Sequence, residues 1–266
     1  MRKAKAGDMV LLLGQDRKSF IRTLRPGEEF QTHRGILHHD SLIGQPLGAQ
    51  VNTHLGYPFF LLTPTTEELV RGIRRKSQIV FPKDAGYIVL RLGVQPGSVV
   101  VEAGTGSGAL TSVFAFQVGE SGHVYSYDVR EDMQSMARSN LRRFGLEDRV
   151  TLIERDIAEG FDPHESGCLF LDLVKPWDYL DQARAALAGG GMLGSLVPTA
   201  NQLVRLITAL EDHPDFAFVE AEELSLRRWK TIPGRVRPSD RMVAHTGFLI
   251  FARAVIPLAE ETNDSA

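Results

Sequence analysis

The sequence contains very little cysteine, with Cys168 alone among 266 residues. A single thiol excludes an intramolecular disulfide framework and is typical of proteins kept in a reducing compartment. Cys168 opens an apolar run, so we interpret it as a buried core thiol. Metal-ligand patterns are also missing: the chain has no Cys pair and no H-x-x-x-H, and His38 and His39 are adjacent rather than helix-spaced. We therefore expect no metal site.

Long apolar runs are equally scarce. The run Met9–Leu13 is too short for the core of a signal peptide, and no stretch approaches the roughly 20 apolar residues that cross a bilayer. The hydrophobic fraction of 43% and the charged fraction of 24% are those of an ordinary globular protein. These features predict a cytoplasmic protein with no membrane partner.

The chain has little excess charge of either sign, with a formal net charge of −3. This balance argues mildly against a general nucleic-acid binder, but a local basic patch can lie on an acidic protein. Two clusters could form such a patch, and a solvated surface is the alternative interpretation of both. They comprise Arg71, Arg74, Arg75 and Lys76, and then Arg227, Arg228, Lys230, Arg235, Arg237 and Arg241.

The pattern of glycines and short apolar runs divides the chain into two domains. Residues 1–66 hold short apolar runs broken by Gly, Pro, Asp and His, which predicts a small antiparallel β domain. A helix over 67–77 follows, with Thr65 or Thr66 as its N-cap, acids in its first turn and basic residues in its last. The second domain spans 67–266, and its first part, 67–87, is the linker.

The second domain alternates apolar strands with helical stretches. Strands are expected at 99–102, 123–129, 150–155, 169–173 and 192–197, and helices at 109–118, about 133–144, 179–187 and 201–211. This alternation predicts an α/β fold whose doubly wound, mostly parallel sheet has helices on both faces. The last two apolar stretches, 216–226 and 245–256, have no helix between them, so we expect an antiparallel pair that closes the sheet.

A glycine turn joins the first of these strands to its helix, in the segment VVVEAGTGSGALT. Glycines let the backbone turn tightly and approach a ligand, and the helix N-terminus offers free N–H groups to an anion. Gly104, Gly106 and Ala109 satisfy the dinucleotide pattern G-x-G-x-x-G/A, with Asp128 as the ribose acid. A dinucleotide oxidoreductase is therefore one interpretation.

Two details favour S-adenosylmethionine instead. Glu102 lies inside the strand, and Gly108 adds a third glycine in the spacing of class I methyltransferases. In that class Asp128, which follows the second strand, would accept hydrogen bonds from the ribose. Asp156, after the third strand, would read the adenine edge. Acids at successive strand ends line the crevice where doubly wound sheets bind ligands.

Several segments in order along almost the whole chain resemble the tRNA adenosine-58 N1-methyltransferase family, in its bacterial and archaeal homotetrameric branch. GTGSG alone would be generic, whereas FPKD, D-x-x-x-P-W and HTGFL in this order are specific. The segments are FPKD at 81–84, EAGTGSGALT at 102–111, SYD at 126–128, LDLVKPW at 171–177, PTANQ at 198–202, LRRW at 226–229, Arg237-Pro238 and HTGFL at 245–249.

The resemblance implies a mechanism and a set of site residues. Asp172 matches the catalytic aspartate, which would accept a hydrogen bond from the adenine N6 amine and stabilise the cationic product. Phe81, in the target-base loop, matches a position that stacks on the extruded base and is usually Tyr. The implied cofactor-binding residues are Gln78, Glu102, Gly104, Gly106, Ser107, Gly108, Leu110, Asp128, Asp156 and Asp172. The implied tRNA-binding residues are Arg227, Arg228, Arg237, His245 and Thr246.

The resemblance thus implies a homotetramer that methylates N1 of adenosine 58 in the tRNA T-loop, with position 57 a further target in some members. Two departures from the family pattern concern the target pocket, namely Lys175 where the family has an acid, and Leu196 where it often has a tyrosine. Rival interpretations are a methyltransferase for a protein carboxylate or small molecule and a non-catalytic tRNA-binding subunit. An intact glycine turn with Asp128 and Asp172 argues against the latter.

Overall fold

The structure is a computed structural model that describes residues 1–256. It divides into two compact units, Met1–Gly72 and a second unit that begins at Ile73. The sequence placed this boundary six residues earlier, at 66. Among residues 1–256, no helix is both long and apolar enough to cross a membrane.

The first unit is built from short antiparallel strands. A four-stranded sheet has the order β2-β1-β6-β5, and β3 pairs separately with β4. The elements are β1 (Met9–Gly14), β2 (Ser19–Thr23), β3 (Glu29–Thr32), β4 (Gly35–His38), α1 (His39–Leu42), β5 (Gln50–Asn52), β6 (Pro58–Leu62) and α2 (Thr66–Arg71). The hydrophobic core of this unit includes three aromatic rings that contact one another, with centroids 5.0 to 6.5 Å apart: Phe20, Phe30 and Phe59.

The helix α2 starts as predicted but ends early. Thr65 caps it, and a capping box joins the side chains of Thr65 and Glu68 to each other's backbone amides. The prediction of a helix to residue 77 was wrong, since α2 ends at Arg71. The reason is a tertiary contact: Asn140 accepts from the Arg74 amide and donates to the Arg74 carbonyl at 2.8 Å, so these groups are not available for a helical turn.

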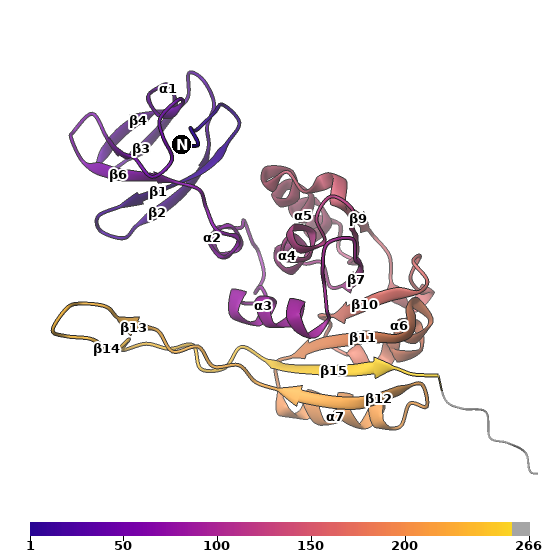
Figure 1. The fold of residues 1–266 in the computed structure, drawn as a ribbon. Coiled ribbons are helices and arrows are strands. Elements are labelled where there is room, and N and C mark those ends of the chain that lie inside the picture. The colour runs from indigo at the N-terminus through magenta and orange to yellow at the C-terminus, as the bar shows by residue number, and fades with distance from the viewer. Residues whose placement is uncertain (257–266) are drawn as a thin grey trace, which may run out of the picture. The chain divides into compact units, whose positions relative to one another are not determined.

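The second unit contains a seven-stranded sheet in the order β12-β15-β11-β10-β7-β8-β9 (Figure 1). All neighbours pair in parallel except β15, which runs antiparallel to both β11 and β12. The strands are β7 (Val99–Ala103), β8 (His123–Tyr127), β9 (Val150–Ile153), β10 (Ser166–Leu171), β11 (Leu187–Val197), β12 (Phe216–Glu222) and β15 (Phe248–Ala254). The predicted mostly parallel sheet with an antiparallel closing pair is confirmed.

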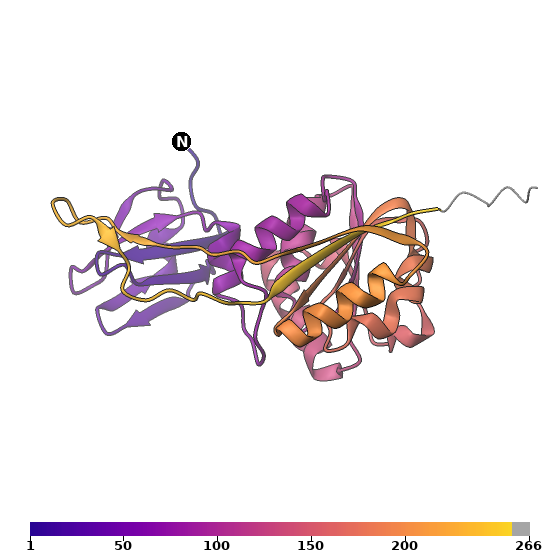
Figure 2. The same cartoon turned by 90° about the horizontal axis from the view of Figure 1, so that it is seen from below.

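Helices cover both faces of this sheet, as the alternating pattern predicted (Figures 1 and 2). One buried cluster joins α3, α4 and α5 to the sheet and includes Phe114, Cys168 and Phe170, so the thiol is in the core. The other joins α6 and α7 to the opposite face. The helices are α3 (Pro82–Arg91), α4 (Ala109–Val118), α5 (Glu131–Phe144), α6 (Leu180–Ala186) and α7 (Ala200–Glu211), with 3-10 turns η1 (Glu147–Arg149), η2 (Ile157–Glu159) and η3 (Pro176–Tyr179).

The helix α3 was not predicted, because residues 67–87 were interpreted as a linker helix and a loop. Its sequence carries the usual signals: Pro82 at the first position, Asp84 in the first turn and Arg91 in the last. Phe81 is the N-cap, and its carbonyl accepts from the amides of Asp84 and Ala85, both at 2.9 Å. The FPKD motif is therefore the first turn of a helix.

Between β12 and β15 the chain forms a long hairpin, residues 223–247, which we call the arm (Figures 1 and 2). Its two short strands, β13 (Trp229–Lys230) and β14 (Arg237–Pro238), pair antiparallel, with Trp229 opposite Pro238. The sequence predicted the strands that flank the arm but not this pairing.

Candidate active site

The glycine turn lies directly beside the end of β10. Gly104, Gly106 and Gly108 all have positive φ, at 96°, 51° and 77°. A Cβ atom on Gly104 would lie 2.1 Å from the main-chain oxygen of Asp172, and one on Gly108 would lie 3.0 Å from the Cβ of Ala137. Both positions thus require glycine for conformation and for space. The turn therefore lies against the main chain that follows β10, and the start of α4 packs against α5.

The carboxylate of Asp128 is held against the same turn. It accepts from the Gly106 amide at 2.9 Å and from the Arg130 amide at 3.0 Å. Two further bonds of 3.0 Å come from the Arg130 guanidinium. Burial alone would raise the pKa of Asp128, but the bonds from Arg130 and Gly106 lower it below its usual value. Asp128 is therefore an anion at neutral pH. Arg130 was not expected from the sequence, where its only signal is its place two residues after Asp128.

Asp172 is the free carboxylate of the site. It follows β10, its amide donates to the Ala103 carbonyl at 2.8 Å, and its side chain is half-buried. Within residues 1–256 no group is hydrogen-bonded to its carboxylate. Burial and the nearby charge of Asp128 raise the pKa of Asp172 to about 6, although Arg130 acts in the opposite direction. An unpaired acid with a raised pKa is typical of a site that acts on a ligand.

Glu102 lies underneath the turn and is 1% exposed. Its Oε2 accepts from the hydroxyls of Thr111 at 2.5 Å and Ser126 at 2.6 Å. Burial raises the pKa of Glu102 to about 8, in spite of these two bonds. The Ser126 hydroxyl also lies 2.7 Å from that of Thr105, so a buried polar network ties β7, β8 and α4 together below the glycines. Thr105, Thr111 and Ser126 were not singled out from the sequence.

The segment that precedes α3 is attached to the turn through α5. Asn140, which is buried on α5, donates from one amide nitrogen to the carbonyls of Arg74 and Ser107, at 2.8 and 2.9 Å. Gln78 lies in this segment and is exposed. Phe81 is half-buried and is not part of either core cluster of the sheet. Both side chains remain available to a ligand.

The residues present fit the methionine part of S-adenosylmethionine. The Ser107 hydroxyl is buried and has no hydrogen-bond partner within residues 1–256, which leaves a donor and acceptor at the turn. The first amides of α4, among them that of Leu110, lie beyond the reach of intrahelical bonding and suit a carboxylate. The Leu110 side chain itself is in the core, so only its backbone can serve. Asp156, the other predicted cofactor residue, is exposed and caps η2 by accepting from the Ala158 amide at 2.9 Å.

The predicted tRNA-binding residues all belong to the arm. Arg227, Arg228 and Arg237 are exposed, and Arg237 pairs with Asp240 at 3.2 Å. His245 and Thr246, at the base of the arm, are hydrogen-bonded inside the protein. His245 has two acceptors, Glu223 at Nδ1 (2.6 Å) and the Pro198 carbonyl at Nε2 (2.9 Å), so making both bonds requires the charged imidazolium. The Pro198 carbonyl and the Glu223 carboxylate raise the pKa of His245 accordingly.

The two departures from the family pattern have different surroundings. Lys175 is exposed at the start of η3. Leu196 packs against the core cluster on the α3 face, and a Cβ on Gly247 would lie 2.8 Å from its Cδ2. Leu196 thus fills the space beside Gly247, the last residue of the arm.

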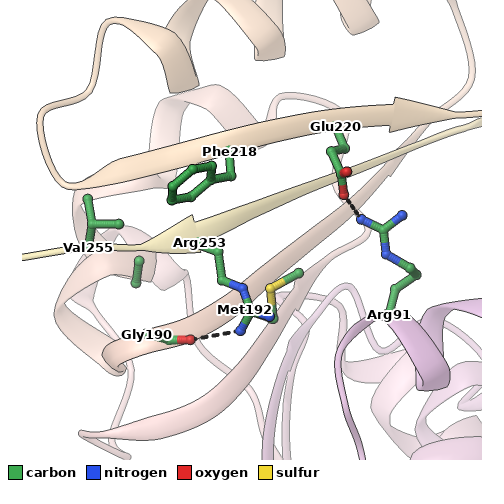
Figure 3. A pocket seen from close by; sticks show the side chains of 8 residues that line it. Arg91, Gly190, Met192, Phe218, Glu220, Arg253 and Val255 are labelled. Carbon is green, nitrogen blue, oxygen red and sulfur yellow. Dashed lines mark hydrogen bonds and ion pairs between the residues drawn. The ribbon is translucent and has the colours of Figure 1, made fainter.

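A separate pocket of about 480 Å³ lies near the amino-terminal part of β11 and contains no predicted site residue (Figure 3). Arg91 is paired there with Glu220, and Arg253 donates to the Gly190 carbonyl at 3.0 Å. Phe218, which is exposed, sits in a bulge of β12 with a φ of 57°. The glycine turn and the acids lie at the carboxyl ends of the parallel strands, where doubly wound sheets bind ligands, and we place the active site there.

Numbered along the chain, the strands of the sheet have the order 3-2-1-4-5-7-6 with strand 7 reversed. With a glycine turn after strand 1 and acids after strands 2 and 4, this fold and site define a class I S-adenosylmethionine-dependent methyltransferase.

Comparison with known proteins identifies the family. The family model described as tRNA methyltransferase complex GCD14 subunit matches residues 57–235, and the model TrmI-like N-terminal matches residues 4–51. The tRNA (adenine(58)-N(1))-methyltransferase TrmI of Thermus thermophilus is 35% identical over 246 residues, which is 91% of this chain and 96% of that protein. The chain belongs to this family of tRNA methyltransferases.

Two solved structures resemble the whole chain. A SAM-dependent O-methyltransferase from Thermotoga maritima has a TM-score of 0.90 and 39% identity, with 97% of each chain covered. The tRNA (m1A58) methyltransferase TrmI from Aquifex aeolicus has a TM-score of 0.82 and 35% identity, with 96% of this chain and 100% of that chain covered. The two names differ in the acceptor atom, which is an oxygen in the first and N1 of adenine in the second.

Proposed function

We propose that this protein transfers a methyl group from S-adenosylmethionine to N1 of adenosine 58 in the T-loop of tRNA. The observation that carries the proposal is the unpaired carboxylate of Asp172 beside the glycine turn. Membership of the family and the likeness to TrmI enzymes support the choice of acceptor. A cytoplasmic location follows from a tRNA substrate.

The cofactor would lie across the carboxyl ends of β7, β8 and β9. The turn and the amides of α4 suit its methionine carboxylate, Asp128 suits its ribose hydroxyls, and Asp156 suits the adenine edge. The full set of residues proposed to hold it is Gln78, Glu102, Gly104, Gly106, Ser107, Gly108, Leu110, Asp128, Asp156 and Asp172. When bound, S-adenosylmethionine supplies a methyl group on a sulfonium sulfur, which keeps the electron pair of the broken bond.

The acceptor chemistry assigns a single task to Asp172. N1 of adenine has a lone pair, so no proton has to be removed before it bonds to the methyl carbon. The ring then becomes cationic. An ionised Asp172 that accepts a hydrogen bond from the N6 amine stabilises this positive charge as it develops. Its pKa of about 6 keeps the carboxylate ionised at the pH of a cell.

The target base needs a place outside the tRNA stack, because N1 lies on its Watson–Crick edge. Enzymes that act on such atoms extrude the base and hold it by stacking on aromatic side chains. Phe81 provides a half-buried ring that is outside the core, at the N-terminus of α3. It therefore serves as the stacking residue, without the hydroxyl of a tyrosine.

The arm provides the surface for the remainder of the tRNA and for assembly. Its cations suit phosphates, and Arg227, Arg228 and Arg237 are the proposed contacts. Its exposed apolar side chains suit a second copy of the chain, in line with a homotetramer. They are Leu226, Trp229, Ile232, Val236, Met242 and Val243. Light scattering of the purified protein tests this assembly, and a monomer at micromolar concentration would contradict it.

The decisive experiment is methyl transfer from labelled S-adenosylmethionine to an unmodified tRNA transcript, followed by nucleoside analysis. We expect 1-methyladenosine, and fragment mapping then assigns it to position 58 alone or to 57 and 58. A transcript with guanosine at both positions is the matched control and should accept no label. Label on a small carboxylic acid or hydroxyl compound, with none on tRNA, would instead identify an O-methyltransferase.

A further inference from the structure

A closed hydrogen-bond cycle lies in the first turn of α3. The Lys83 ammonium donates to Asp84 Oδ1 at 2.7 Å, to the Thr246 hydroxyl at 2.7 Å and to the Leu224 carbonyl at 2.8 Å. The Thr246 hydroxyl donates in turn to Asp84 Oδ2 at 2.8 Å. Every N–H of the ammonium and both oxygens of the carboxylate are therefore used.

The cycle joins two parts of the chain that are distant in sequence. Lys83 and Asp84 belong to the FPKD motif, whereas Leu224 follows β12 and Thr246 precedes β15. Leu224 and Thr246 are the two roots of the arm. Three bonds across 141, 163 and 162 residues thus hold both roots to one helical turn.

The charges of this cycle are buried. The side chain of Asp84 is 1% exposed and that of Lys83 is 10% exposed. A buried ion pair recovers its desolvation cost only through complete hydrogen bonding, and apolar residues of similar volume often stabilise a fold as well or better. The advantage of the ion pair is therefore structural specificity: a polar network whose hydrogen bonds are all satisfied holds its members in one arrangement.

The cycle lies next to the part of the active site that is proposed to receive the target base. Phe81 is the N-cap of the same turn, and its carbonyl is bound by the amide of Asp84. On the other side, the neighbour of Thr246 is His245, which bonds the Pro198 carbonyl just beyond β11. Asp84 and Thr246 therefore connect the root of the arm to Phe81, the ring proposed to stack on the target base.

We propose that Lys83, Asp84 and Thr246 are positioning residues that hold Phe81 and the arm in the arrangement that accepts the extruded base. The inference rests on the proposed methylation of tRNA. Thr246, which the resemblance placed among residues that contact tRNA, then acts from within the protein. In this role the three residues act through Phe81 and the arm, rather than by touching the cofactor or the reacting atoms.

The variant Thr246→Val tests the proposal, because it keeps the shape of the side chain and removes the hydroxyl that closes the cycle. We expect kcat/KM for tRNA to fall at least tenfold, while the Kd for S-adenosylmethionine changes less than twofold. Thr246→Ser retains the hydroxyl and should restore kcat/KM to within about threefold of the wild type. Thr208→Val, at an exposed site on α7, is the matched control and should behave as the wild type.

A second readout separates positioning from general stability. Hydrogen exchange should show faster exchange of the amides of Asp84 and Ala85 in Thr246→Val, with the amides of β7 and β10 unchanged. A tRNA with 2-aminopurine at position 58 should show a smaller rise in fluorescence on binding, because the base is extruded from the tRNA stack less completely when Phe81 is out of place. Equal loss of tRNA and cofactor binding, or wild-type kcat/KM in a folded Thr246→Val, would overturn the positioning role.

Failure of the proposed function has a different signature. A wild-type protein that methylates no tRNA contradicts the function itself, whatever the variant does. The exchange measurement still decides the structural part in that case, since unchanged exchange at Asp84 and Ala85 would show that the cycle does not hold α3.

Discussion

The main-chain oxygen of Asp172 lies only 2.1 Å from the position that a Cβ atom of residue 104 would take. Gly104 therefore lets the end of β10 and the start of the glycine turn approach each other. The same approach brings the Asp172 carboxylate within electrostatic reach of Asp128, whose charge helps to raise the pKa of Asp172. The proposed catalytic acid and the proposed ribose acid are thus coupled through a contact that depends on glycine.

Substitution of this glycine should cost more than its backbone conformation alone. Gly104→Ala adds a collision with backbone to a φ of 96°, and we expect a loss of about 3 kcal/mol or more of unfolding free energy. Gly145→Ala is the matched control, since its φ is 69° and nothing lies within 4 Å of its Cβ, so it should cost about 1 kcal/mol. Urea unfolding measures both. Equal losses would show that the contact with Asp172 is not rigid.

Removal of the Asp172 charge should impair turnover much more than cofactor binding, because Asp172 is one of ten residues proposed to hold the cofactor but the only carboxylate proposed to bind the N6 amine. Asp172→Asn keeps the shape but loses the negative charge that stabilises the product cation, so kcat should fall by roughly 10- to 100-fold. In the wild type, kcat/KM for S-adenosylmethionine should fall as pH drops through about 6, where Asp172 takes up a proton. Single-turnover kinetics measures the loss of turnover, and calorimetry measures the Kd for S-adenosylmethionine. Normal turnover in the variant would remove Asp172 from the mechanism.

The same variant should change the pH dependence of stability. The pKa of Asp172 is about 6 in the folded protein and about 3.9 in an unfolded chain, so the folded state binds more protons between these values. The contribution of this carboxyl group therefore falls as pH rises from about 4 to 6 and stays low above 6. Asp172→Asn should be more stable than the wild type at pH 8, by on the order of 1 kcal/mol because the half-buried group is partly screened by water. The difference should vanish near pH 4, and a constant difference would contradict the assignment.

Charge removal on the arm should weaken tRNA binding in a salt-dependent way. The triple variant Arg227→Gln, Arg228→Gln and Arg237→Gln should raise the Kd and flatten the slope of log K against log salt by about 0.9 for each lost phosphate contact. Arg142→Gln on α5 is the control for loss of an exposed positive charge. Filter binding at about 50 to 200 mM salt gives the slopes, because the affinity changes strongly over this range. An unchanged slope would make the arm arginines ordinary surface residues.

The sequence by itself determined the elements whose causes are local. The strand, glycine turn and helix at 99–118, the cap at Gly145 and the closing pair β12 and β15 were all predicted, because periodicity and turn residues act over a few positions. The acids Asp128 and Asp172 could be placed at one edge of the sheet for the same reason, since parallel strands end together.

Only the tertiary structure decided the contacts that join distant segments. Asn140 bonds the backbone at Arg74 and so excludes the predicted last turns of α2, and Arg130 folds back onto Asp128. The cycle of Lys83, Asp84 and Thr246 spans more than 160 residues, and no local pattern encodes such a pairing. Local propensity specifies the segments, whereas burial and hydrogen-bond satisfaction across the folded core decide which of their polar groups meet.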